Sequence, residues 1–319
     1  MPDAAEWLSK LRQDTTAANQ AAGAAARCLE FDPRIFRDCF DREPFAVHHH
    51  LAGNALFTLE RLAALARFIE AQPNQVYADA GVADLNQRWD ESAHPATSLA
   101  QTVEQIVGND TWIILRPLEL DREYRLLLNR CLDELRAGIG GDWGRPVWRE
   151  NSIVFLTSPR RLSTYHIDRE CNFILQLQGE KTLYVFDRND REVLPETELE
   201  RYWAVDSNAA RYKPQYQDRA RVFRLRPGDG VHVPVNCPHW VQNDDNVSIT
   251  LSINFQFHDS DRANKYRANY YLRKLGINPA PPGRYPRRDA VKAFAYRATM
   301  ALRSRVRRDR QTTPAGYGG

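Results

Sequence analysis

The second half of the chain, after Gly140 and Gly141, is a succession of short apolar runs separated by turn residues. Eight runs have the length and the β-branched or aromatic composition of strands. They cover residues 153–157, 162–167, 173–178, 182–186, 222–225, 231–233, 240–242 and 247–257. Gly, Pro, Asn and Asp lie between them, as at Gly179-Glu180. Eight short strands with such turns predict a jelly roll, or double-stranded β-helix.

The regions on either side of these strands have helical spacing. Apolar residues recur three and four positions apart after Phe31, after Thr58 and after Asp121, and Ser98 with Gln101 forms a capping box. Short strands are expected at 44–47 and 111–116, and further helices at 196–203 and 288–308. We therefore predict a mainly β fold with flanking α-helices. Its parts are an arm (1–30), an α/β portion packing on the core (31–148), the β-helix core (149–258) and a basic helical extension (259–319).

Composition limits the class of protein. The chain has 319 residues, of which 43% are hydrophobic and 27% charged, as in ordinary globular proteins. A net charge of +3 gives no reason to expect a nucleic-acid partner. Five scattered cysteines argue against a disulfide framework and against a thiolate zinc site. With no apolar run of membrane length and no signal-peptide pattern, we predict a cytoplasmic protein without a membrane association.

Three residues in the strand region have the chemistry of a metal site. His166 and Asp168 are two positions apart, so on a strand both side chains project from one face. His239 can add a second imidazole from a later strand. Two histidines and one carboxylate form the facial triad of non-haem Fe(II) oxygenases. The consecutive histidines 48–50 cannot all point one way, so we expect a surface or turn role for them rather than a metal role.

A lysine follows the predicted metal strand and could bind an anionic cosubstrate. Lys181 comes after the Gly179-Glu180 turn and begins a strand. A lysine at that position is commonly a solvated charge at a strand edge. Here the run from Leu175 to Phe186 should be core on both sides, which favours a buried lysine paired with a carboxylate.

These residues carry a family resemblance. Residues 150–257 resemble the JmjC-type Fe(II)- and 2-oxoglutarate-dependent dioxygenases of the cupin superfamily, nearest the asparaginyl-hydroxylase branch. The matching positions are Ser-x-x-His-x-Asp at 163–168, Asn172-Phe173, Gln176, Gly179-x-Lys181 and Asn254-Phe255.

The resemblance implies both the cofactors and the residues that hold them. The implied Fe(II) ligands are His166, Asp168 and His239. Lys181 and Ser163 would hold the distal carboxylate of the cosubstrate 2-oxoglutarate, and Asn172 and Asn254 would hydrogen-bond its chelating end. Oxygen is the second cosubstrate. An aromatic hydroxyl often assists at the distal carboxylate, and Tyr165 and Tyr184 are nearby in sequence.

The resemblance further implies hydroxylation, or oxidative demethylation, of a protein or peptide side chain. One alternative is the same chemistry on a small molecule, such as an amino acid or a natural product. A second alternative is a non-catalytic cupin-type regulator that binds a ligand or nucleic acid. We expect Trp240, beside His239, to be a packing residue rather than a substrate platform.

The C-terminal extension is strongly basic between Arg284 and Arg310 and has apolar residues at helical spacing, including Val291, Phe294 and Leu302. This amphipathic pattern has three interpretations. The first is a packing helix, with a homodimer formed through C-terminal helices. The second is recognition of an acidic protein or peptide, and the third is binding to nucleic acid or to a membrane surface.

Overall fold

The structure is a computed structural model, and it describes residues 27–71, 76–81, 84–88, 97–108, 110–140, 147–257 and 260–312. The chain divides into two compact units. The first contains residues 1–193 and 211–258, and the second contains residues 194–210 and 259–319. Most of the predicted N-terminal arm lies outside the described residues.

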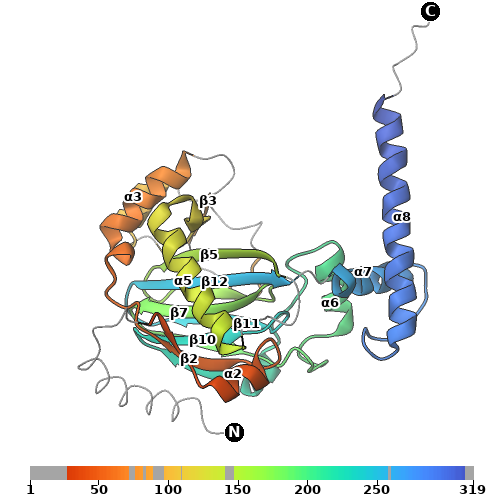
Figure 1. The fold of residues 1–319 in the computed structure, drawn as a ribbon, viewed down its shortest axis with the longest axis horizontal. Coiled ribbons are helices and arrows are strands. Elements are labelled where there is room, and N and C mark those ends of the chain that lie inside the picture. Colours follow the sequence, from red (N-terminus) through yellow and green to blue (C-terminus); the bar gives the residue numbers. More distant parts are fainter. Residues whose placement is uncertain are drawn as a thin grey trace, which may run out of the picture. The chain divides into compact units, whose positions relative to one another are not determined.

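The described part of the first unit contains two antiparallel β-sheets (Figure 1). The larger has the strand order β1-β2-β10-β7-β12-β5-β4-β3, and the smaller has the order β6-β11-β8-β9. The strands are β1 (Leu29–Glu30), β2 (Phe45–His49), β3 (Val76–Ala80), β4 (Thr111–Leu115), β5 (Val147–Thr157), β6 (Leu162–His166), β7 (Cys171–Gln178), β8 (Lys181–Val185), β9 (Arg221–Leu225), β10 (Asp229–Val233), β11 (His239–Asn243) and β12 (Ser248–Phe257). Every strand predicted between residues 153 and 257 is present, so the predicted fold class is confirmed.

Two edge strands were not predicted. β1 is two residues long, and β3 has the sequence Val-Tyr-Ala-Asp-Ala. Neither has a strand-like pattern of its own. β1 pairs with β2, and β3 pairs with β4 over the full length from Val76 to Ala80. Their extended conformation therefore accompanies pairing to a stronger neighbouring strand.

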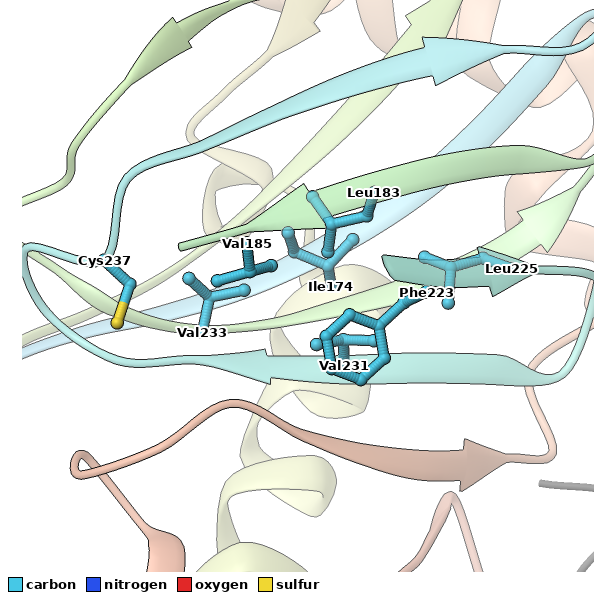
Figure 2. Packing of buried hydrophobic residues seen from close by; sticks show 8 residues of the cluster. All are labelled: Ile174, Leu183, Val185, Phe223, Leu225, Val231, Val233 and Cys237. Carbon is cyan, nitrogen blue, oxygen red and sulfur yellow. The ribbon is translucent and has the colours of Figure 1, made fainter. Parts of the chain in front are cut away.

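The two sheets face each other across an apolar core (Figure 2). Its members come from β7 and β10 of the larger sheet and from β8 and β9 of the smaller one, with Cys237 from the β10–β11 loop. They are Ile174, Leu183, Val185, Phe223, Leu225, Val231, Val233 and Cys237. These residues define the inner face of each sheet. Because side chains alternate along a strand, the inward positions of the neighbouring strands follow from the pairing register.

Aromatic rings pack on the outer face of the larger sheet. Phe36 of α2 (Pro33–Cys39) stacks on Phe173 of β7, with ring centroids 5.9 Å apart. Phe40 stacks on Phe255 of β12 at 5.8 Å. His232 of β10 lies in the same cluster, 4.7 Å from the ring of Phe173. The α2 helix begins as its sequence indicates, because Asp32 caps it and Pro33 occupies the first turn.

The other predicted helices of the first unit are present. They are α3 (Leu59–Glu70), α4 (Leu99–Glu104) and α5 (Arg122–Gly138). Thr58 and Asp121 cap α3 and α5, and Ser98 and Gln101 form the predicted capping box of α4. Short 3₁₀ turns lie at Ala55–Phe57, Leu118–Leu120 and Pro214–Arg219. The caps are local interactions, which is why the sequence predicted them.

The second unit contains α6 (Glu196–Ala204), α7 (Ser260–Lys274) and α8 (Pro286–Thr312). The helices predicted at 196–203 and 288–308 correspond to α6 and α8. Arg273 of α7 donates to the buried carboxylate of Glu200 on α6 at 2.6 Å, which joins these two helices. Among the helices that the structure describes, none is both long enough and apolar enough to cross a membrane.

Candidate metal centre

The three predicted metal ligands meet at one end of the interior between the sheets. His166 ends β6 and pairs directly with His239, which begins β11. The His239 Nε2 atom lies 3.6 Å from Asp168 Oδ2, and His166 Nε2 lies 4.0 Å from the same oxygen. One ligand atom from each residue falls within 4.8 Å of the others. In the described parts of the chain, this is the only cluster of His, Cys, Asp and Glu that could hold a metal ion.

The tautomer of both imidazoles is set by backbone carbonyls. His166 Nδ1–H donates to the carbonyl of Thr164 at 2.6 Å, and His239 Nδ1–H donates to that of Cys237 at 2.9 Å. The Nε2 lone pairs therefore remain available for a metal. Burial, aided by the nearby His166, lowers the pKa of His239 to about 4 even though Asp168 opposes the shift. His239 is consequently neutral at pH 7, as a metal ligand must be.

Asp168 is placed differently from the prediction. β6 ends at His166, so Asp168 lies in the loop beyond the strand, and strand alternation does not direct its side chain. Two hydrogen bonds hold it instead. Asn236 N–H donates to the Asp168 carbonyl at 3.0 Å, and Asn172 Nδ2 donates to Asp168 Oδ2 at 3.3 Å. The side chain is therefore held by Asn172, four residues later, and the backbone by the distant Asn236, rather than by the alternation of a strand.

Ser163 reaches the inner face because β6 is irregular. Residues three apart on a regular strand point to opposite faces, yet His166 pairs with His239 and Ser163 pairs with Val241. The register shift between these pairs is a β-bulge, which inserts one extra residue in β6. Ser163 and His166 therefore lie on the same face.

Lys181 lies at the opposite end of the interior. It follows the turn at Gly179, which has a φ of +74° that favours glycine, and it is only 5% exposed. Its Nζ donates to Thr250 Oγ1. Among the described residues no carboxylate of the chain pairs with it, and the predicted pairing with a cosubstrate carboxylate stays a prediction. Burial lowers the pKa of Lys181 to about 7.

A fixed chain of hydrogen bonds orients the partner of Lys181. Gln176 Nε2 donates to the carbonyls of Gln178 at 2.7 Å and Gly179 at 3.0 Å, so its Oε1 must face the other way. That oxygen accepts the Thr250 hydroxyl proton at 2.9 Å. Thr250 thus presents a lone pair to the lysine, and the remaining ammonium protons are free for a ligand.

The predicted amides Asn172 and Asn254 are adjacent on the inner face, since they pair in the β7–β12 ladder. Both are buried. Asn254 Nδ2 donates to Asn151 at 3.0 Å, and Ser252 Oγ donates to Asn254 Oδ1 at 2.8 Å. The buried Oδ1 of Asn172 accepts no hydrogen bond from the residues that the structure describes.

Sequence reasoning missed four supporting residues, namely Asn151, Gln176, Thr250 and Ser252 (Gln176 was noted only as part of the family pattern). A signal for two of them is present in β12. Ser248, Thr250, Ser252 and Asn254 alternate with apolar residues, although all of these positions are buried. A polar stripe along a buried strand indicates a lined interior site.

The nearby aromatic residues face away from the interior. Tyr184 alternates with the inward Leu183 and Val185 and stacks on Trp240, with ring centroids 4.1 Å apart. Trp240 Nε1 also donates to Gln217 at 3.3 Å, which fits the predicted packing role. Tyr165 packs against Phe186 and Tyr212 rather than beside Lys181.

The three consecutive histidines differ from one another. His49 is 1% exposed, donates through Nε2–H to the Gln176 carbonyl at 2.8 Å, and has its pKa lowered to about 3 by burial. The predicted surface or turn role is therefore wrong for His49. His50 lies 3.4 Å from Glu30. None of the three belongs to the metal-binding cluster found among the described residues.

Residues 89–262, more than half of the chain, match the family of proteins with a cupin-like domain. The chain belongs to this family. No curated protein matches the sequence. The match concerns the family as a whole, so the nearer relation to the asparaginyl-hydroxylase branch stays a prediction.

Solved structures of Escherichia coli YcfD are similar to this chain. One has 15% identity and a TM-score of 0.52, and the alignment covers 85% of this chain and 68% of YcfD. A second, described as the ribosomal oxygenase YcfD, has 17% identity and a TM-score of 0.46 over 86% and 68% of the two chains. A third, in complex with cobalt and 2-oxoglutarate, has 17% identity and a TM-score of 0.48 over the same shares. At these identities the likeness concerns the fold.

Proposed function

We propose that this protein is an Fe(II)- and 2-oxoglutarate-dependent oxygenase that hydroxylates, or oxidatively demethylates, a protein or peptide side chain. One observation carries the proposal. The same interior holds a convergent His166, Asp168 and His239 cluster at one end and a buried lysine without a carboxylate partner at the other. A cation site and an anion site at the two ends of one interior fit a metal together with a chelating dicarboxylate.

The donor set fits Fe(II). Two neutral imidazole nitrogens and one carboxylate oxygen form a triad on one side of a metal, which leaves positions for a chelating cosubstrate and for oxygen. His166 and His239 would bind through Nε2, since each Nδ1–H is engaged by a carbonyl. Asp168 would bind through Oδ2, the oxygen nearest to both rings.

The opposite end fits the distal carboxylate of 2-oxoglutarate. In the β8–β11 ladder His239 pairs with Val185 and Asn243 pairs with Lys181, so four residues separate the two ends. That corresponds to about 13 Å along the strand. The lysine side chain and a five-carbon dicarboxylate would together span this distance. Lys181 and Ser163 would hold the distal carboxylate. Asn172 and Asn254 would orient the chelating end.

The chain's own residues bind, orient and exclude water. When bound, Fe(II) with 2-oxoglutarate and O₂ supplies oxidation of a substrate C–H bond, with succinate and CO₂ as co-products. The apolar core residues between the two ends would surround a bound cosubstrate with a site of low polarity. There the charge-assisted hydrogen bond from Lys181 is stronger than it would be in water.

The first experiment tests the cofactors. Purified protein is mixed anaerobically with Fe(II) and 2-oxoglutarate, and we expect a weak visible charge-transfer band. The band should be lost in Asp168→Ala and kept in His50→Ala, a histidine outside the cluster. A folded wild-type protein that binds neither Fe(II) nor 2-oxoglutarate would contradict the proposal.

The second experiment tests the substrate class. Succinate formation is compared with peptide pools, including peptides from ribosomal proteins, and with metabolite extracts. We expect stimulation by peptides, and the description of YcfD as a ribosomal oxygenase is the reason for including ribosomal sequences. Stimulation by metabolites alone would support the small-molecule alternative. Turnover with neither, together with salt-sensitive DNA binding, would support the regulator.

We further propose a homodimer formed through α8, in a protein that works in the cytoplasm. Val291, Phe294 and Leu302 lie on one side of this helix and are 68%, 66% and 64% exposed. Such exposed apolar residues favour association over a solvated helix. Sedimentation analysis should show a dimer that Phe294→Glu converts to a monomer. A wild-type monomer at micromolar concentration would contradict this proposal.

The unbridged state of all five cysteines is compatible with a reducing cytoplasm.

A further inference from the structure

A buried acidic residue outside the metal cluster contacts the loop that carries one of its ligands. Asp41 follows α2, is 5% exposed and has a φ of +47°. Its Oδ1 accepts the Val235 N–H at 3.0 Å. Val235 belongs to the loop between β10 and β11, and that loop leads directly to His239.

Arg188 completes the contact. Its Nη1 donates to Asp41 Oδ1 at 3.3 Å and to the Val235 carbonyl at 3.0 Å, and its Nη2 donates to the Asp41 carbonyl at 2.6 Å. Both the N–H and the C=O of Val235 are therefore bound by the Asp41–Arg188 pair. The two residues are 147 positions apart in sequence.

The loop fixed by this pair holds two metal ligands at once. Asn236 N–H donates to the carbonyl of Asp168 at 3.0 Å, and the Cys237 carbonyl accepts the His239 Nδ1–H at 2.9 Å. Asn236 has a φ of +65°, an uncommon backbone conformation that neighbouring contacts must maintain. Displacement of Val235 would move both the Asp168 backbone and the carbonyl that orients His239.

A second route leads from Asp41 to the same carboxylate. Asp41 N–H donates to Nε2 of the buried His232 at 3.0 Å, and His232 Nδ1–H donates to the Asn172 carbonyl at 3.0 Å. The Asn172 side chain in turn donates to Asp168 Oδ2. Asp41 is thus connected both to the loop before His239 and to the strand that supports Asp168.

We propose that the Asp41–Arg188 pair is a positioning device for the metal centre, and that it holds Asp168 and His239 at the separation which a divalent metal requires. This inference rests on the metal site of the proposed function. The physical reason is that the triad combines two neighbouring strands of the smaller sheet with the loop after β6, and a bound metal tolerates little variation in ligand spacing. A largely buried ion pair gives little net stability, but it fixes one geometry because the buried carboxylate of Asp41 cannot be left unpaired, although the Arg188 side chain is 20% exposed. Outer contacts of this kind commonly change metal affinity about 10- to 100-fold.

The structure offers a matched control for testing this proposal. Asp79 and Arg161 form another buried ion pair, 2.9 Å apart, with side chains 5% and 4% exposed. This pair joins β3 to the β5–β6 loop, and the other bonds described for Arg161 go to Ser158 and Asn243 rather than to the 234–238 loop. Asp79→Asn should cost folding stability as Asp41→Asn does, without changing the metal centre. Asparagine also tolerates the positive φ at position 41.

The experiment measures Co(II) and Fe(II) affinity by anaerobic titration, well below the unfolding temperature of each variant. We expect Asp41→Asn to weaken metal binding about 10- to 100-fold and to change the Co(II) absorption spectrum. Asp79→Asn should bind metal like the wild type. In the metal-free protein, amide hydrogen exchange at Val235 and Asn236 should accelerate in Asp41→Asn only.

Other outcomes separate the two proposals. Equal metal affinity and equal exchange in Asp41→Asn and Asp79→Asn would overturn the positioning role and leave the proposed function intact. A wild-type protein that binds no metal would contradict the proposed function itself. If Asp41→Asn does not fold, Arg188→Gln gives the same test, because it removes the guanidinium and keeps the Asp41–Val235 bond. It should show a smaller loss of metal affinity in the same direction.

Discussion

The two ends of the interior are both built around a buried base, and burial lowers the pKa of each. His239 falls to about 4 and Lys181 to about 7. At neutral pH the histidine has lost its charge, whereas about half of the lysine remains a cation. The same desolvation therefore produces a lone-pair donor for a metal at one end and an anion site at the other.

The surroundings of the two bases reinforce this difference. The histidine end has a carboxylate 3.6 Å away and carbonyls that fix the tautomer. The lysine end has a single neutral partner, the Thr250 hydroxyl, whose proton is directed toward Gln176. Among the described residues, the missing carboxylate at Lys181 therefore favours an anionic ligand there, just as the carboxylate beside His239 favours a metal.

The largest expected effect comes from removing Asp168, the carboxylate that lies close to both histidines. Asp168→Ala should abolish measurable Fe(II) binding, beyond the roughly 10- to 100-fold loss typical of outer contacts. Two imidazoles alone hold Fe(II) weakly, and the carboxylate also balances its charge. Titration calorimetry with Mn(II) as a redox-stable probe measures this. Affinity within a factor of three of the wild type would show that Asp168 is not a ligand.

The next largest effect is expected at the lysine end alone. Lys181→Met should weaken 2-oxoglutarate binding about 10- to 100-fold, the value of a hydrogen bond to a charged group, and leave metal affinity unchanged. Titration of 2-oxoglutarate into the metal-loaded protein checks this, with Lys213→Met, which removes a half-buried lysine bound to the Val193 carbonyl, as the control. Loss of metal and cosubstrate together would indicate that the two ends are not independent.

The affinity for 2-oxoglutarate and the folding stability should change with pH in opposite directions, because both depend on the charge of Lys181. The carboxylate needs the cation, so 2-oxoglutarate affinity should fall about tenfold from pH 6 to pH 8, while His239 stays neutral throughout. The folded pKa lies below the unfolded value of about 10.4, so the unfolded chain binds more protons between about pH 7 and pH 10. The ligand-free protein should therefore gain stability over that range.

Lys181→Met is the control for both slopes. It should remove the pH dependence of 2-oxoglutarate binding and the corresponding rise in stability, as measured by denaturant unfolding at several pH values. Slopes that persist in the variant would assign the titration to another group.

A smaller effect is expected at the residue that supports the lysine. Thr250→Val keeps the shape of the side chain and removes the one hydrogen-bond partner that the described residues offer the Lys181 ammonium, so 2-oxoglutarate should bind about three- to tenfold more weakly. Thr182→Val, which lies on the opposite face of the small sheet, is the control. Equal affinities for the two variants would show that Thr250 only packs.

Much of the fold could be predicted because its signals are local. Caps at Thr58 and Asp121 and the eight strand runs depend on residues near in sequence. β3 was missed because its strand conformation depends on pairing with β4. The face of β12 that points inward also could not be predicted, because its polar residues would ordinarily face solvent.

The candidate site shows the same division. The residue types at positions 166, 168, 239 and 181 indicated a metal and an anion site. Their placement had other causes, however, namely a bulge in β6 for Ser163 and hydrogen bonds from Asn172 and the distant Asn236 for Asp168. The assignment of the ligand and cosubstrate contacts to these residues remains a proposal, which the variants above test.

The sequence by itself determined which chemical groups are available and which segments form strands, since both follow from side-chain identity and short-range spacing. Only the tertiary structure decided that Asp41 and Arg188 meet behind the loop before His239, and that Lys181 has no carboxylate beside it. The physical reason is that burial and pairing are properties of the assembled sheets. A charge acquires its pKa, its partner or its lack of one only after strands far apart in sequence have enclosed it.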